Sequence, residues 1–228
     1  MIDHIGQTGP RRQQVAVLFA DICGFTRLVE SVEPEAVYRI MRPLLDDLVA
    51  CVHEHGGEIQ QVLGDGFMAV FGLRRAGEAS FGGATSFGGE ASFGGATSFG
   101  GATSFGGHTS FGDETERATA AAYAMLRGVR PGRPDIHVGI ECGEVLVTRS
   151  WEPAGFGVWG RAVNLAQRMC GVAGPGELML GPAAYARSEH LAAPATAATV
   201  RVRGVADPVA AHRVVVLPAR AAGLPVAA

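Results

Sequence analysis

Two aspartates are placed where a sheet can present them together for metal chemistry. Asp21 directly follows Val15–Ala20, an apolar run of strand length that is typical of a buried strand. Asp65 lies between Gly64 and Gly66, in a hairpin signal. Either aspartate alone is more typical of a turn or cap. If the hairpin packs beside the first strand, however, the two carboxylates meet and can bind two hard cations about 3.5–4 Å apart, an arrangement suited to in-line phosphoryl displacement.

Two further groups are compatible with phosphate chemistry. The turn formed by Gly24, Phe25 and Thr26 follows the first aspartate and offers backbone amides that can hold phosphate oxygens. Asn164 and Arg168 are four residues apart, so an expected helix places them on one face. Such residues are usually just solvated, but an Arg directed at a phosphorus atom stabilises charge that develops in the transition state.

The elements that must position these residues follow from hydrophobic spacing. After the first strand comes a helical pattern, then the hairpin, an Ala-rich helix, a strand pair, a further helix and small C-terminal strands. The expected ranges are helices at 31–55, 114–127 and 161–172, and strands at 59–63, 67–71, 136–142 and 144–148. This order predicts an α+β domain with helices packed on one face of a mainly antiparallel sheet.

A hexapeptide repeat containing Ser-Phe-Gly-Gly interrupts this pattern at 80–112. It is too short for a stable β-helix, and its Gly pairs carry a large ordering entropy. We therefore expect a flexible insertion over 78–112 at a tolerant surface site. The expected organisation is an irregular leader at 1–13, one domain at 14–217 and a tail at 218–228.

Composition excludes several classes of protein. The formal charge of −3 over 228 residues gives no general attraction to nucleic acid or to an anionic membrane. The four cysteines form no CxxC pair, which argues against a zinc site or a disulfide framework. The N-terminus has no signal-peptide pattern, and no apolar stretch reaches the roughly 18 residues of a membrane-spanning helix. These features predict a cytoplasmic protein.

Four motifs resemble those of the class III adenylyl and guanylyl cyclases in order and spacing. They are FADICGFT, GDGFMAVF, HVGIECGE and WGRAVNLAQRM, and the resemblance spans about residues 14–216. It implies a ferredoxin-like α+β fold that pairs head to tail as a homodimer, with active sites at the dimer interface. The implied reaction converts a purine nucleoside triphosphate into its 3′,5′-cyclic monophosphate and pyrophosphate.

The resemblance also implies roles for individual residues. Asp21 and Asp65, helped by the backbone carbonyl of Ile22, would bind two Mg²⁺ or Mn²⁺ ions, which activate the 3′-hydroxyl for attack on the α-phosphorus. Asn164 and Arg168 would be catalytic, the first positioning the ribose and the second stabilising the transferring phosphoryl group. Arg203 stands where the family usually has a basic residue that contacts the triphosphate, and Gly24, Phe25 and Thr26 would also contact substrate.

This sequence departs from the family at base recognition. Adenylyl cyclases usually have Lys at the position of Gln61, and Asp or Thr at that of Gly157. Guanylyl cyclases would have Glu and Cys there. A Gln amide both donates and accepts, so it suits either purine, whereas Gly157 offers only backbone. Because some relatives with Gln at the first position are adenylyl cyclases, ATP is favoured.

Three alternatives remain open at this level. The domain could be a catalytically silent relative that binds nucleotide or regulates a partner, a reading that the unusual base-selecting residues favour. It could be a cyclase with relaxed or non-adenine specificity. A diguanylate cyclase would share the sheet scaffold, but its GG(D/E)EF hairpin is absent, since residues 63–67 read LGDGF. The complete set of Asp21, Asp65, Asn164 and Arg168 favours an active cyclase.

Overall fold

The strand β1 (Arg11–Ile22) is an interior strand of an eight-stranded sheet. The computed structural model describes residues 9–74, 113–129, 132–149, 156–192, 194–201 and 207–216; the predicted insertion and tail lie outside them. Because β1 begins at Arg11, the last residues of the predicted leader belong to this strand.

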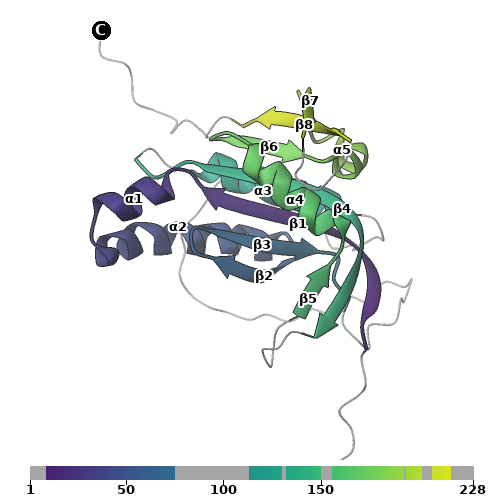
Figure 1. Ribbon diagram of the computed structural model, residues 1–228, viewed down its shortest axis with the longest axis horizontal. Helices are drawn as coiled ribbons and strands as arrows, with labels where there is room; N and C mark the ends of the chain where they lie inside the picture. Colours follow the sequence, from purple (N-terminus) through teal and green to yellow (C-terminus); the bar gives the residue numbers. More distant parts are fainter. Residues whose placement is uncertain are drawn as a thin grey trace, which may run out of the picture.

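The sheet is mostly antiparallel, as predicted. Its order is β2-β3-β1-β4-β6-β8-β7, with β5 paired to β4, and the β4–β6 pair is parallel. Figure 1 shows the strands side by side. Their bounds are β2 Gly57–Leu63, β3 Gly66–Phe71, β4 Ile136–Arg149, β5 Phe156–Trp159, β6 Glu177–Leu180, β7 Thr196–Val200 and β8 Val209–Val215.

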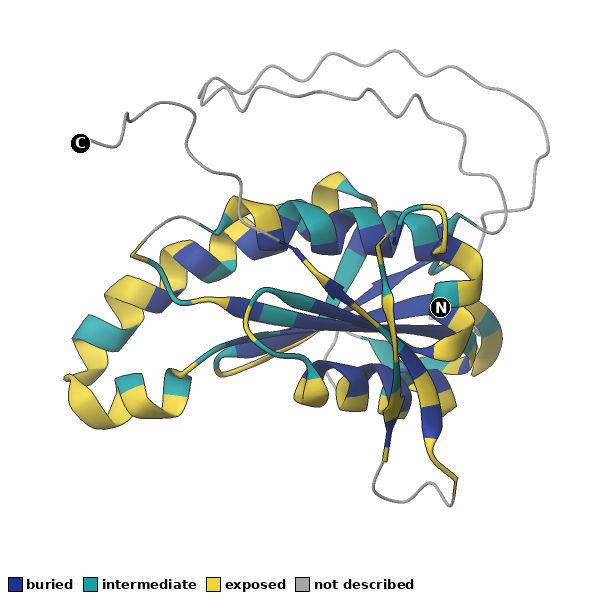
Figure 2. Cartoon of the chain, turned by 90° about the horizontal axis from the view of Figure 1, so that it is seen from above, coloured by how far each residue is buried: buried dark blue, intermediate teal, exposed yellow. Residues whose placement is uncertain are grey.

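Helices cover both faces of the sheet, so the prediction of helices on one face was wrong. The larger core lies between the sheet and helices α2 (Pro34–Glu54), α3 (Glu114–Gly128) and α5 (Pro182–Ser188), with the short α1 (Phe25–Ser31) beside α2. Helix α4 (Arg161–Val172) packs on the opposite face. Figure 2 shows helices above and below the sheet.

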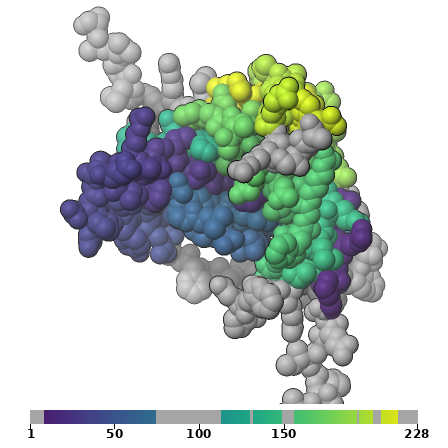
Figure 3. Space-filling view, viewed as in Figure 1, coloured from purple at the N-terminus to yellow at the C-terminus, as the bar shows by residue number. Residues whose placement is uncertain are grey.

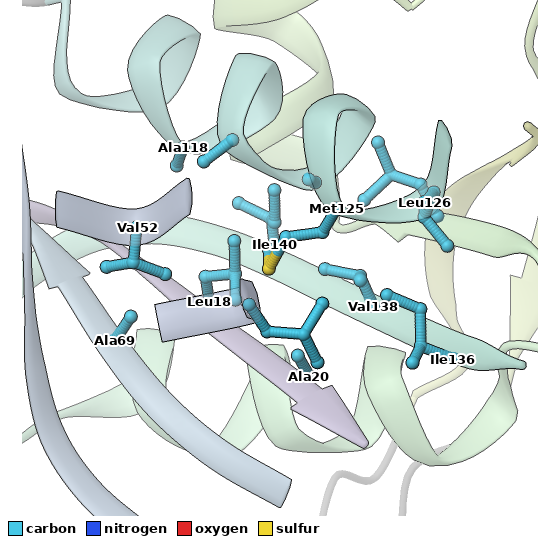
Figure 4. Packing of buried hydrophobic residues seen from close by; sticks show 14 of the residues in the cluster. Leu18, Ala20, Val52, Ala69, Ala118, Met125, Leu126, Ile136, Val138 and Ile140 are labelled. Carbon is cyan, nitrogen blue, oxygen red and sulfur yellow. The ribbon is translucent and has the colours of Figure 1, made fainter. Parts of the chain in front are cut away.

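Alternation along β1 decides which residues meet which helices. One set of its side chains packs into the larger core: Ala16, Leu18, Ala20 and Ile22. Figure 4 labels two of them, Leu18 and Ala20. The alternate set turns to the face of α4, where Val15, Val17 and Phe19 pack with Ala162 and Ala166. The next residue of this second set is Asp21, so strand geometry places it on the α4 face.

Gly139 sets the distance between α4 and the sheet. A Cβ atom at this position would lie 2.6 Å from the carbonyl oxygen of Ala166 and 2.7 Å from the Cα of Cys170. Only a glycine lets the backbone of β4 approach the backbone of α4 this closely. The helix that carries Asn164 and Arg168 is thereby seated directly on the strand.

Residues 136–149 form one long strand rather than the expected pair. The whole of β1 has partners along β4, from Arg11 opposite Val147 to Ile22 opposite Ile136. Gly143, which suggested a break, lies within this ladder opposite Val15.

The two sides of the predicted insertion meet in the described part of the chain. A Cβ atom on Gly72, which follows β3, would lie 2.9 Å from Cβ of Glu114, at the start of α3. The chain therefore leaves the fold and re-enters it at neighbouring points.

Candidate active site

A hollow of about 340 Å³ lies between the ends of β1 and β3 and helix α4. We call it the aspartate hollow; its lining includes Asp21, Asp65, Phe67, Gln167, Arg168 and Gly171. It therefore contains both predicted metal aspartates and the predicted catalytic Arg, as the convergence of the strand and hairpin required. Figure 3 shows the molecular face on which the blue surface of β2 and β3 borders the green surface of α4.

Local backbone geometry brings the two aspartates together. The hairpin turn is Gly64-Asp65, with Gly64 at a φ of 65°, a conformation that favours glycine. Gly66 is the register partner of Asp21, and a Cβ atom on it would lie 2.9 Å from Asp21 Oδ1 and 2.6 Å from the Ala20 carbonyl oxygen. Both glycines of the motif are thus needed, one for the turn and one for the approach to Asp21.

The two carboxyl groups differ in their electrostatic environment. Hydrogen bonding from His137 lowers the pKa of Asp21, and this effect exceeds the opposing effect of burial. The pKa of Asp65 is raised, first by burial and then by the negative charge of Asp21. Two neighbouring carboxylates with this mutual repulsion form a site that a cation stabilises.

The two carboxylates, Asp21 and Asp65, fit hard cations that are also coordinated by water or substrate oxygens. Among the described residues, no group of three or more His, Cys, Asp or Glu side chains is arranged to hold a metal ion. Two carboxylates suit Mg²⁺ or Mn²⁺ held jointly by protein, water and substrate phosphate oxygens, because Mg²⁺ usually keeps several waters and binds through one or two carboxylates.

Of the two predicted catalytic residues on helix α4, only one borders the aspartate hollow. Its apolar side chains, including Leu165, Ala166 and Met169, are buried, while Asn164 and Arg168 are exposed. Arg168 borders the aspartate hollow of its own chain, but Asn164 is not part of the lining. A single chain therefore brings together Asp21, Asp65 and Arg168 without the residue predicted to hold the ribose.

The other predicted substrate contacts lie outside the aspartate hollow. Gly24, with a φ of 77°, precedes α1, and Phe25 and Thr26 begin that helix. Gln61 is exposed on β2, opposite Met68 and beside an irregularity in the β2–β3 register. Arg203 lies outside the described residues.

The space beside Gly157 is already filled. Gly157 on β5 pairs with Thr148, and a Cβ atom here would lie 2.6 Å from Thr148 Oγ1 and 3.0 Å from Trp159 Nε1. The indole N–H of Trp159 donates to Thr148 Oγ1 at 3.3 Å, and the Trp159 residue is 66% exposed. A hydroxyl and an indole thus occupy the place where a base-reading side chain would start.

Sequence reasoning missed His137 and Cys23 as neighbours of Asp21. His137 Nε2 lies 3.5 Å from Asp21 Oδ2, and Cys23 Sγ lies 3.1 Å from His137 Nδ1. Burial and the charges of Asp135 and Asp21 raise the pKa of the Cys23 thiol to about 11. The motif HVGIECGE begins at His137 and could have drawn attention to this residue. Only the β1–β4 register shows that His137 faces Asp21.

Comparisons with known proteins agree with the motifs. Residues 8–88 match the family described as the adenylate and guanylate cyclase catalytic domain. An adenylate cyclase from Anabaena cylindrica is 34% identical over 67 residues, which are 29% of this chain but only 13% of that enzyme. This chain thus matches a small part of that relative's length.

Solved cyclase structures share the fold along nearly the whole chain. A guanylyl cyclase crystal structure superposes with a TM-score of 0.68 and 23% identity, covering 94% of this chain and 98% of that one. The adenylyl cyclase CyaB from P. aeruginosa gives a TM-score of 0.62 at 22% identity, covering 90% and 95%. The solved structures that share this fold thus include both a guanylyl cyclase and an adenylyl cyclase. No described helix is long and apolar enough to span a membrane.

Proposed function

We propose that this chain is a class III adenylate/guanylate cyclase catalytic domain, the family that residues 8–88 match and whose fold solved cyclases share, and that it converts a purine nucleoside triphosphate into the 3′,5′-cyclic monophosphate and pyrophosphate. The observation that carries the proposal is that Asp21 and Asp65 line one hollow, where two carboxylates can hold the metal ions of phosphoryl transfer. A silent relative would not need to retain this combination of charges.

Each residue has a definite part in the proposed reaction. Asp21 and Asp65, with the carbonyl oxygen of Ile22, hold two Mg²⁺ or Mn²⁺ ions. When bound, these ions supply Lewis-acid chemistry at the reacting hydroxyl and the phosphate oxygens. The guanidinium of Arg168 stabilises negative charge on the transferring phosphoryl group, and the amide of Asn164 orients the ribose.

A homodimer completes the proposed site. Asn164 is exposed and lies outside the aspartate hollow of its own chain, so a head-to-tail partner is needed to bring the ribose-positioning amide to the metal aspartates. In this arrangement Asp21 and Asp65 of one chain face Asn164 and Arg168 of the other. A two-fold dimer contains two such sites.

ATP is the preferred substrate in this proposal, but by a modest margin. The Gln61 amide can pair with either purine, and Gly157 has no side chain with which to reject the wrong one. A complete hydrogen-bonding site can discriminate by about 10⁴-fold or more. We therefore expect a much smaller ratio of kcat/KM for ATP over GTP.

Turnover of the purified protein with ATP, GTP, CTP and UTP, first with Mn²⁺ and then with Mg²⁺, tests the proposal. Cyclic purine nucleotide should form and should disappear on chelation of the metal. Asp65→Ala serves as the matched inactive control. A dimeric, folded chain that forms no cyclic nucleotide from any of the four substrates would support the silent alternative.

A further inference from the structure

His137 and Asp21 occupy opposite positions on neighbouring strands. They are direct partners in the antiparallel β4–β1 register, so their side chains emerge on the same face of the sheet. His137 Nε2 lies 3.5 Å from Asp21 Oδ2, and the side chains are 16% and 42% exposed. Backbone pairing thus holds the two side chains next to each other on one face of the sheet.

Both oxygens of the Asp21 carboxylate are engaged. The backbone N–H of Ile22 donates to Oδ1 at 3.1 Å, while Oδ2 faces His137. Each carboxylate oxygen has two lone-pair directions, so these two contacts leave each oxygen a second direction. The two contacts restrict the rotation of the carboxylate without using up its capacity to bind metal.

The second nitrogen of His137 is held as well. Nδ1 lies 3.1 Å from Cys23 Sγ, and the backbone N–H of Cys23 donates to the Asp135 carbonyl oxygen at 2.8 Å. A carboxylate only accepts hydrogen bonds, so the tautomer that can donate to Asp21 carries its hydrogen on Nε2. In the neutral ring Nδ1 then accepts, and the thiol donates to it.

We propose that His137 is a positioning residue that fixes the Asp21 carboxylate for cation binding, with Cys23 fixing the imidazole ring. The inference rests on the proposed function, because it concerns the same metal site. Hydrogen-bonding groups behind metal ligands typically change metal affinity by about 10–100-fold when they are removed. His137 is expected to act in this range.

Binding of Mn²⁺ alone to the purified full chain, followed by the electron paramagnetic resonance signal of free Mn²⁺, tests the inference. His137→Phe should weaken binding by about 10–100-fold, whereas His137→Gln should recover most of it because its amide again offers an N–H. Cys23→Ala should weaken binding less, and Cys23→Ser should match the wild type because a hydroxyl still donates to Nδ1.

A second measurement separates positioning from a general structural defect. The Mn²⁺ concentration that gives half-maximal turnover should rise in His137→Phe, while the KM for ATP at saturating Mn²⁺ should change little and the variant should still unfold in one cooperative thermal transition. If His137→Phe fails to fold, the contrast between Cys23→Ala and Cys23→Ser takes its place.

The outcomes distinguish this inference from the proposed function. Wild-type Mn²⁺ affinity in folded His137→Phe, equal affinity in the two Cys23 variants, or no binding by the wild-type chain would overturn the positioning role. Absence of turnover in a wild-type chain whose Mn²⁺ binding still depends on His137 would refute the cyclase proposal and leave the positioning role supported.

Discussion

Asp21 and Arg168 line the same hollow of a single chain, although they come from β1 and α4. The site can therefore be assembled either within one chain or between two chains. Arg168 either serves the aspartates of its own chain or, as proposed, those of a partner.

Mixing two inactive variants decides between these answers. Asp65→Ala and Arg168→Ala should each be inactive alone. With free subunit exchange at equal amounts, half of the dimers are heterodimers, and each contains one doubly defective site and one intact site. About a quarter of the wild-type activity should return, measured as cyclic nucleotide formed. A mixture that stays inactive, with exchange shown by mass, would place the Arg and both aspartates in one chain.

Replacing either aspartate should abolish most of the activity, but the two replacements should change the stability of the fold differently. Asp21→Asn and Asp65→Asn should each lower kcat by about 100-fold or more, since the metal site supplies several kcal/mol of transition-state stabilisation. In urea unfolding at neutral pH, Asp21→Asn should be less stable than the wild type because it weakens the contact with His137. Asp65→Asn should be at least as stable, because it removes a carboxylate repelled by Asp21. Equal losses of stability would contradict this electrostatic difference.

Crowding at Gly157 should be measurable as coupling with Thr148. Gly157→Ala introduces a Cβ atom into the space of Thr148 Oγ1 and Trp159 Nε1, and overpacking of this kind typically costs about 1–3 kcal/mol. Thr148→Ala should relieve the clash, so the double variant should lose less free energy of unfolding than the sum of the single variants. Strict additivity would show that the cost of Gly157→Ala does not come from its contact with Thr148.

Glu141 should make stability depend on pH. It is 2% exposed, its Oε1 accepts from the backbone N–H groups of Cys142 and Ala184, and among the described residues its Oε2 has no hydrogen-bond partner. Burial raises the pKa of Glu141 above its ordinary value.

Because the folded state then takes up the proton before the unfolded state does, this carboxyl group favours folding more as the pH falls. Relative to the wild type, Glu141→Gln should gain stability at neutral pH and lose that advantage toward the ordinary carboxyl range. Urea unfolding at several pH values measures this difference. A constant difference across the range would contradict the assignment.

Replacing 78–112 with a linker about a quarter as long should leave the fold intact. The chain on either side meets at Gly72 and Glu114, so a short linker can close the gap. Two halvings of loop length favour folding by roughly 1.2 kcal/mol, a change that thermal unfolding can detect. Turnover should be retained, and its complete loss would mean that the insertion orders the site or the dimer.

Much of the sheet could be predicted because apolar runs and turn glycines are local signals. The run Val15–Ala20 lies within the interior strand β1, and the Gly64-Asp65 turn joins β2 and β3 as expected. The face covered by α4 could not be predicted, because an amphipathic pattern shows that a helix is buried on one side but not which face of the sheet it covers. Gly139 was the available sign of a close helix, since glycine within a strand often marks such an approach.

Only those residues of the candidate site that lie in recognisable local motifs could be predicted from the sequence. Asp21 and Asp65 come together as predicted, because a strand end and a hairpin are both recognisable. His137 was missed because its position opposite Asp21 depends on the register of two strands far apart in the sequence. The role of Gly157 remains a prediction, and its filled surroundings depend on Thr148 and Trp159 from neighbouring strand positions.

The contact of α4 with Gly139 also limits how the site can respond to substrate. Backbone atoms of Ala166 and Cys170 rest on this glycine, so the helix has no room to move toward the sheet, and moving away would expose buried Leu165 and Met169. Helix α4, with Asn164 and Arg168, is therefore expected to move together with β4 as one rigid body. In the proposed dimer, we expect adjustment around a nucleotide to come from rotation of the two chains against each other, or from the β2–β3 turn that carries Asp65.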